Sequence, residues 1–96
     1  MTRDAIMLNA GDTVATALRG LAAGETVQVH GGDGAIEVVL GDAIPFGHKL
    51  ALVPIEPGDP VLKYGISIGR ATARIEAGCH VHTHNLISDR ARPVKS

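Results

Sequence analysis

The clearest pattern in the chain is a pair of apolar segments with the spacing of β-strands. Residues 26–30 (Thr-Val-Gln-Val-His) alternate between polar and apolar, which is typical of a half-buried strand. Residues 35–40 (Ala-Ile-Glu-Val-Val-Leu) read as a second strand, and the Gly-Gly-Asp-Gly sequence at 31–34 suits a turn between them. The pattern therefore predicts a β-hairpin over 26–40, preceded by a short strand over 5–8.

The region between the first strand and the hairpin has a different spacing. Apolar residues within 14–21 recur at i, i+3, i+4 and i+7, which is one stripe of an α-helix. Asp12 or Thr13 is placed to cap its start by accepting backbone N–H bonds, and Gly24 suits its end. This pattern predicts one short helix near the N-terminus, with a role in core packing.

An internal repeat follows. The pattern Ala-x-x-x-[Leu/Ile]-x-x-Gly-x-x-Val occurs at 17–27, 51–61 and 71–81. The offsets are unequal, which excludes a solenoid of fixed period. In the last two copies the pattern predicts a strand, a tight turn and a second strand. Pro57-Gly58 suits a type II turn, because Pro presets φ and Gly takes the positive-φ position.

Composition supports a small, mainly β domain. Apolar residues make up 45% of the 96 residues, yet the chain has one Phe, one Tyr and no Trp, so the core must be built from Val, Ile, Leu and Ala. Twelve glycines indicate many tight turns. We expect a mainly β fold with one short helix, organised as a single domain over 1–87 and a flexible polar tail or linker over 88–96.

Charge and cysteine content exclude several classes of protein. The formal net charge of −1 gives no general attraction to nucleic acid, and basic residues do not cluster among aromatic ones. No apolar run approaches the length that crosses a membrane, and the start lacks an apolar signal region. Cys79 is the only cysteine, so no internal disulfide can form. We therefore expect a cytoplasmic protein that binds neither nucleic acid nor membrane.

The segment 78–85 (Gly-Cys-His-Val-His-Thr-His-Asn) contains three of the five histidines. On a strand, residues two apart share a face at about 6.5–7 Å, so His80, His82 and His84 would line one side. Two of these imidazoles can reach one cation, whereas three in a straight row span too far. We expect two metal ligands here, completed by another segment, water or substrate. The alternative is a solvated edge strand whose histidines only block pairing with other chains.

Two motifs give the chain a resemblance to a known family. Gly-His-Lys at 47–49 and Val-His-Thr-His-Asn at 81–85 resemble the N-terminal SAF-type domain of the altronate and galactarate dehydratases. The same domain is the separate small subunit of some members, such as the sulfolactate sulfo-lyase alpha subunit. The similarity covers about residues 12–86, and it is carried by Ile44–Leu52, Ile55, Gly58, Lys63–Gly65, Ile68, Gly69, Ala71, Gly78 and Val81–Asn85.

The resemblance implies a β-clip fold and a lyase that works with a large catalytic subunit and a divalent metal, Fe²⁺ or Mn²⁺. The reaction would remove water from a sugar acid such as altronate or galactarate, or sulfite in the sulfolactate branch. Self-association into a homo-oligomer is a further option. A noncatalytic module that binds sugar acids or tunes assembly, and a β-clip scaffold of unrelated role, are the alternatives, because a fold does not fix a function.

The resemblance makes His82 and His84 the predicted metal ligands, with contact to the carboxylate of the substrate as the alternative. His80 departs from the pairing that the motif emphasises, so we rank it below its neighbours. His30 lies in the predicted hairpin, outside the motif, and is expected to be structural. Cys79 should point away from the histidines as a buried, unreactive thiol.

The remaining site residues follow from the same motifs. His48 and Lys49 are the predicted catalytic residues, and Lys49 and Asn85 are the predicted substrate contacts. An elimination next to a carboxylate needs a base, an acid for the leaving group and stabilisation of the developing negative charge. The carboxylates of this chain are scattered and mostly in predicted turns, so the sequence supplies half of an active site.

Overall fold

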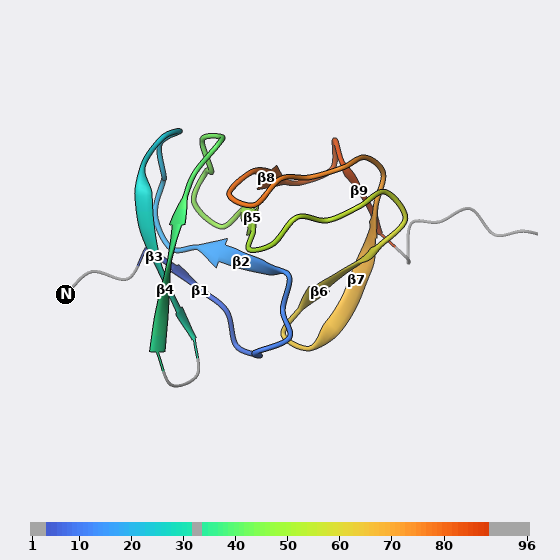
Figure 1. Cartoon of the computed structure of the whole chain (residues 1–96), viewed down its shortest axis with the longest axis horizontal. Coiled ribbons are helices and arrows are strands. Elements are labelled where there is room, and N and C mark those ends of the chain that lie inside the picture. Colours follow the sequence, from blue (N-terminus) through green and yellow to red (C-terminus); the bar gives the residue numbers. More distant parts are fainter. Residues whose placement is uncertain (1–3, 32–33, 89–96) are drawn as a thin grey trace, which may run out of the picture.

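The computed structural model describes residues 4–31 and 34–88, which form two sheets (Figure 1). The spatial order of the larger sheet is β4 (Gly34–Val39), β3 (Thr26–Gly31), β1 (Ala5–Ile6), β2 (Val14–Ala17), β5 (Lys49–Ala51) and β8 (His80–Val81). The smaller sheet has the order β6 (Pro60–Lys63), β7 (Ile66–Ala71) and β9 (Leu86–Ser88). Neighbouring strands are antiparallel except β1 and β3, which are parallel. The predicted mainly β fold is confirmed.

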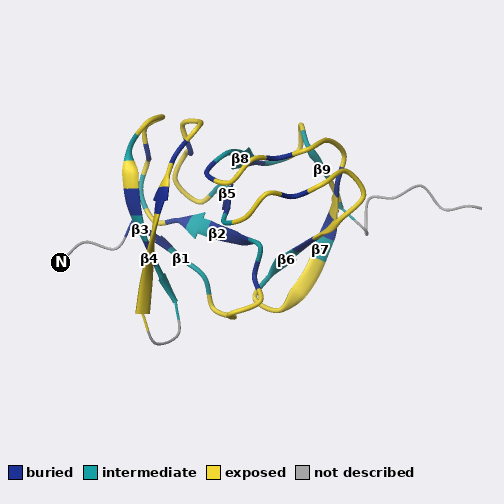
Figure 2. Ribbon diagram, viewed as in Figure 1, coloured by how far each residue is buried: buried dark blue, intermediate teal, exposed yellow. Residues whose placement is uncertain are grey.

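The predicted hairpin is present as β3 and β4. Their register runs from Thr26 opposite Val39 to Gly31 opposite Gly34. Val27 and Val29 of β3 are fully buried, as their alternation predicts, whereas Val38 is the one buried residue of β4. β4 lies at the edge of the sheet, so most of its side chains face solvent (Figure 2).

The predicted helix is wrong, because Val14–Ala17 forms the strand β2 and the described residues contain no helix. β2 lies between β1 and β5 in the sheet and separates two apolar cores. Ala15 packs in the first core, while its neighbour Val14 packs in the second. Since both faces of the strand are buried, the alternation that identifies a strand is lost, and the apolar spacing imitates a helix.

The two expected helix caps have other partners. Asp12 is buried, and its carboxylate accepts N–H bonds from Gly65 (2.7 Å) and Asn9 (3.2 Å). Thr13 accepts the N–H of Leu62 through Oγ1 at 2.9 Å. Short polar side chains do accept backbone N–H groups here, as a cap does, but the donors Leu62 and Gly65 are 49 and 53 residues away along the chain. These bonds join the start of β2 to the β6–β7 hairpin.

The internal repeat is a structural unit that occurs four times, and we call each copy a corner. The three recognised copies, 17–27, 51–61 and 71–81, are joined by 40–50, where Leu replaces both the first Ala and the last Val. Each corner contains a turn whose glycine has a positive φ of 82–88°. The turn is closed by an N–H···O bond of 3.0–3.1 Å from the ninth residue to the sixth. The predicted type II geometry of Pro57-Gly58 agrees with the φ of 88° at Gly58.

The corners associate in two pairs with the same backbone hydrogen bonds. In each pair the fifth residues exchange two N–H···O bonds: Leu21 with Ile44, and Ile55 with Ile75, at 2.8–2.9 Å. The backbone N–H of the glycine in one corner donates to the carbonyl of the first residue of the other corner. The N–H of that first residue in turn donates to the carbonyl of the ninth residue, which follows the glycine. The chain is therefore two similar paired units joined end to end at β5.

Each paired unit builds one core. The first core centres on corners 17–27 and 40–50 and the second on 51–61 and 71–81, and β5 contributes Leu50 to one and Ala51 to the other. The last described strand ends at Ser88, so the rest of the predicted tail, 89–96, lies outside the described residues. No helix among the described residues is long and apolar enough to cross a membrane.

Candidate metal centre

Strand pairing brings three histidines together from two corners. β5 pairs with β8 so that Lys49 lies opposite Val81 and Leu50 opposite His80. This register places His48, which ends the turn before β5, opposite His82. His80 and His82 flank the fully buried Val81, so their side chains lie on the other face of the strand, as the predicted alternation requires.

The three imidazoles are stacked closely. The ring centroids of His48 and His82 are 4.1 Å apart, those of His48 and His80 are 5.1 Å apart, and those of His80 and His82 are 5.5 Å apart. Nδ1 of His48 lies 2.9 Å from Nε2 of His80, so one nitrogen donates to the other. One ring nitrogen from each residue lies within 4.8 Å of the other two. The group therefore brings one nitrogen from each of three residues close together, and we call it the histidine cluster (His48, His80 and His82).

Side chains fix the backbone that carries two of these rings. The backbone N–H of His80 donates to Oδ2 of Asp42 at 2.9 Å. Asn85 donates through Nδ2 to the carbonyl of His80 (2.8 Å) and accepts the N–H of His82 through Oδ1 (2.9 Å). Asp42 and Asn85 thus satisfy the outer edge of β8 and hold the loop that follows it.

The surroundings favour neutral imidazoles. Burial lowers the pKa of His80, and the positive charges that His84, His48 and His82 can carry lower it further, against an opposing effect of Asp42. Burial also lowers the pKa of His82, followed by the charges of His48 and Lys49. A neutral imidazole is the form that binds a metal, so the lowered pKa values of His80 and His82 favour the form of these two rings that can act as a ligand.

The geometry of the cluster fits a divalent metal ion. Two nitrogens that each lie about 2.1 Å from a metal, at right angles, are about 3.0 Å apart, close to the 2.9 Å between His48 and His80. The ring planes differ by only 9–19°, so the rings would turn about χ2 to direct their in-plane lone pairs at one ion. Imidazole nitrogen suits zinc, iron, copper and nickel. Three such ligands leave coordination positions for water, substrate or another protein.

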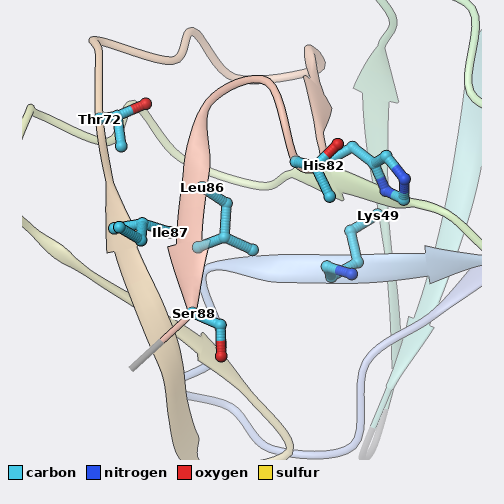
Figure 3. Close-up of a pocket in the computed structure, with 7 residues that line it drawn as sticks. Lys49, Thr72, His82, Leu86, Ile87 and Ser88 are labelled. Carbon is cyan, nitrogen blue, oxygen red and sulfur yellow. The ribbon is translucent and has the colours of Figure 1, made fainter. Parts of the chain in front are cut away.

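Lys49 and His82 border a pocket of about 420 Å³ beside the cluster (Figure 3). Its other lining residues are Thr72, Thr83, Leu86, Ile87 and Ser88. Lys49 is partly buried in β5, and this burial, with the charge of Lys63, lowers the pKa of its ammonium group. The two predicted catalytic residues, His48 and Lys49, therefore lie in different parts of the site. His48 belongs to the cluster, and Lys49 lines the pocket.

The other predicted ligand, His84, is not among the three residues whose ring nitrogens lie within 4.8 Å of one another. The ring of His84 is exposed, and its centroid is 5.2 Å from that of His80 with a tilt of 34°. The structure groups His82 with His48 and His80 instead, and the ligand role of His84 stays a prediction. The register between the two strands, which brings His48 opposite His82, is the signal that the sequence did not reveal.

Three further predicted residues have clear positions. Both polar ends of the Asn85 side chain bind backbone groups of its own loop, which agrees with a turn-capping role, and its substrate contact stays a prediction. Cys79 packs against the second core. Burial is the main cause that raises the pKa of its thiol, and the negative charge of Asp42 raises it further. His30 lies on β3, which β1 and β2 separate from β5, so it is remote from the cluster.

Comparison with known proteins places these residues in a family context. Residues 3–89 match the model of the altronate/galactarate dehydratase SAF domain. Over 80 residues the chain is 46% identical to an altronate dehydratase of Escherichia coli and 38% identical to one of Bacillus subtilis. These alignments cover 83% of this chain but 15% of each relative.

A second group of relatives is named as lyase subunits, and one of them is aligned over 99% of its own length. The chain is 37% identical over 93 residues to the (2R)-sulfolactate sulfo-lyase subunit alpha of Chromohalobacter salexigens, which covers 94% of this chain and 99% of the relative. The chain is also 52% identical over 42 residues to the subunit of the same name from Paracoccus pantotrophus. The expected resemblance is confirmed: the chain belongs to the altronate/galactarate dehydratase SAF domain family.

Proposed function

We propose that this chain is the small subunit, or the SAF domain, of a metal-dependent lyase. Together with a large catalytic subunit it would eliminate water, or sulfite, from a hydroxy acid. The observation that carries the proposal is the convergence of His48, His80 and His82, with nitrogens within 4.8 Å of one another, beside a pocket lined by Lys49. Relatives named altronate dehydratase and sulfolactate sulfo-lyase subunit alpha support it.

The proposed chemistry assigns the histidine cluster to a divalent metal, Fe²⁺ or Mn²⁺. Such an ion, when bound, would stabilise the negative charge that develops when a proton leaves the carbon next to a carboxylate. His48, His80 and His82 would hold it, and the proposal replaces His84 as a ligand with His48 and His80. Lys49 stays the candidate for a proton donor or a contact to the acid.

The chain does not supply the whole reaction. Asp42 is the carboxylate that contacts the cluster region, and its Oδ2 already accepts the N–H of His80. A base for the proton and further metal ligands would then come from the large subunit. The chain matches 99% of a subunit alpha and 15% of the altronate dehydratases, so the proposal holds for a small subunit and for a domain of a longer protein.

Metal binding by the chain tests the first part of this proposal. We expect the metal-free chain to bind Co²⁺, a coloured stand-in for Fe²⁺, with one ion per chain. Replacing His48, His80 or His82 by Ala should each weaken binding at least about tenfold, because loss of a ligand costs no less than loss of a supporting residue. His84→Ala is the matched control and should change the affinity less than about threefold.

The opposite ranking would favour the original assignment. If His84→Ala abolished Co²⁺ binding while His48→Ala did not, the ligand pair would be His82 and His84, as the motif alone predicts. No binding by any form of the chain, alone or with its large subunit, would remove the metal site altogether.

Turnover distinguishes the lyase from the alternative of a noncatalytic module. The chain and its copurifying large subunit are assayed for loss of water from altronate and galactarate and for release of sulfite from sulfolactate. A catalytic role predicts that His82→Ala lowers turnover at saturating substrate with the complex intact. Unchanged turnover with weaker assembly would identify a binding or assembly module instead.

A further inference from the structure

The turn that precedes β5 presents a phenylalanine beside the histidine cluster. Phe46 is the only phenylalanine of the chain, and its exposed fraction of 72% is the largest among the described large apolar residues. It shares the four-residue turn 45–48 with His48. A lone exposed apolar side chain is ordinary on a protein surface, so exposure alone assigns it no role. Its position beside the cluster, on a turn of fixed geometry, is what distinguishes Phe46.

Main-chain hydrogen bonds hold this turn on both sides. The N–H of His48 closes the turn at 3.0 Å, and the N–H of Gly47 donates to the carbonyl of Ala17 at 2.9 Å. The carbonyl of His48 accepts the N–H of Ala17 at 2.8 Å, and Ala17 itself is buried. Phe46 is therefore an aromatic side chain on a fixed backbone. Such a side chain loses little conformational freedom when a partner covers it.

The other corners show that the fold does not need an aromatic side chain at this position. Phe46 is the seventh residue of its corner, and the seventh residues of the other corners are Ala23, Pro57 and Ala77, all of them exposed. Those corners keep the same closing hydrogen bond. Phe46 also belongs to neither of the two apolar cores. An aromatic ring here therefore serves contact with something outside the domain better than it serves packing within it.

The side of the molecule that carries the cluster is basic. Burial lowers the pKa of His82, and the charges of His48, Lys49 and His84, which lower it further, all belong to basic groups. A protein surface that covers this side is favoured when it presents carboxylates, because opposite charges then face each other across the contact. Carboxylates are also the groups that the proposed elimination still needs from outside this chain.

We propose that Phe46 anchors the large catalytic subunit, which covers the histidine cluster with a surface that combines an apolar pocket and carboxylates. The ring of Phe46 fills the apolar pocket, and the carboxylates face the basic groups. Thr83 and His84, exposed in the loop after β8, form part of the polar rim of the contact. The identity of the partner rests on the proposed function, whereas the contact residue follows from the structure.

Photochemical crosslinking identifies what touches residue 46. A benzophenone amino acid replaces Phe46, the complex is purified from cells that make the chain and the large subunit, and the crosslinked peptides are sequenced after irradiation. We expect crosslinks to the large subunit. The matched control carries the same amino acid in place of Ile66, which is 67% exposed, and should give none. Ile66 lies in the β6–β7 hairpin, which is bonded to the start of β2, whereas the turn of Phe46 is bonded to Ala17 at the end of that strand (Figure 1).

Substitutions measure how much the ring contributes to assembly. Phe46→Ala should weaken binding of the purified chain to the large subunit about ten- to a hundredfold, because it removes a large apolar side chain that the complex buries. Phe46→Leu keeps an apolar side chain and should recover most of the affinity. Ile66→Ala is the control and should cost less than about threefold. Dispersed amide spectra of each variant show that it folds.

Four results would overturn the proposal. They are crosslinks from residue 46 to a second copy of this chain, no crosslink from residue 46 in a complex that contains the large subunit, equal losses of affinity from Phe46→Ala and Ile66→Ala, and a chain that copurifies with no large subunit. The first would make this face a self-association surface.

Turnover is measured separately, so the contact and the lyase can fail independently. A complex that assembles through Phe46 but releases neither water nor sulfite would keep the contact and remove the lyase. An active complex whose affinity is unchanged by Phe46→Ala would keep the lyase and remove the contact.

Discussion

The corners provide a matched pair of glycines for a stability experiment. Gly58 and Gly78 occupy the same position in paired corners and have nearly the same φ, 88° and 86°. A Cβ added at Gly58 meets nothing within 4 Å, whereas one at Gly78 would lie 2.2 Å from the carbonyl oxygen of Val39. Alanine at both sites therefore shares the strain of a left-handed backbone, and Gly78→Ala adds a collision with the end of β4.

The structure sets the size of each effect. A left-handed conformation costs an L-residue about 1–2 kcal/mol, so Gly58→Ala should destabilise the protein by that amount. Overpacking adds about 1–3 kcal/mol, so Gly78→Ala should destabilise it by about 2–5 kcal/mol. A domain of this size loses about 4–8 °C in thermal midpoint per kcal/mol, so the two variants should differ by at least about 4 °C.

Urea and thermal unfolding of the two variants measure the free energies. Because residue 79 follows directly and leads into His80, Gly78→Ala should also weaken Co²⁺ binding by the cluster, whereas Gly58→Ala should not. Equal destabilisation of the two variants would refute the argument, since it would mean that the Val39 carbonyl yields at no cost. An unchanged stability of Gly58→Ala would refute the strain assigned to the turn.

Three further predictions concern groups outside the cluster. Burial alone would raise the pKa of Asp12, but the N–H donors led by Gly65 lower it below 3.8. Its contribution to stability is therefore present above pH 3.8 and lost as the pH falls further. The thermal midpoint of Asp12→Asn should consequently fall less steeply with acid than that of the unchanged protein. Parallel plots of midpoint against pH for the two proteins would contradict this. Thr13→Val leaves the N–H of Leu62 without its acceptor and should cost about 1–3 kcal/mol in urea unfolding, whereas Thr13→Ser should cost less. Burial raises the pKa of Cys79, so iodoacetamide should alkylate it more slowly in the folded chain than in urea; equal rates would show an accessible thiol.

The sequence predicts those strands whose two faces differ. β3 alternates between buried valines and polar residues, and its hairpin is found where the pattern places it. β2 is misread because Val14 and Ala15 pack in different cores, so no polar face marks the strand. The fourth corner is missed for a related reason: Leu40 and Leu50 replace the Ala and Val of the pattern, while the burial of both positions and the turn are kept.

The site is predicted in part, because its residues come from two segments. The sequence identifies the histidine-rich segment and the Gly-His-Lys motif, and it places His80 and His82 on one face of a strand. Pairing register cannot be read from either segment alone, and this register brings His48 to His82 and gives His80 a place in the cluster. Lys49 is identified by its motif. Thr72 lies in no motif, and only the folded structure shows that it lines the pocket.

The paired corners have a consequence for how this protein can change. The hydrogen bonds that join paired corners are made by main-chain atoms, and the ninth side chain differs from corner to corner (Glu25, His48, Asp59 and Cys79), although Glu25 and Asp59 also accept the N–H of the sixth residue of their own turn. A turn from one corner should then be transplantable into another. The histidine cluster takes His48 from the first unit and His80 and His82 from the second, so corners 17–27 and 51–61, which carry none of it, are the places where a second site could be built.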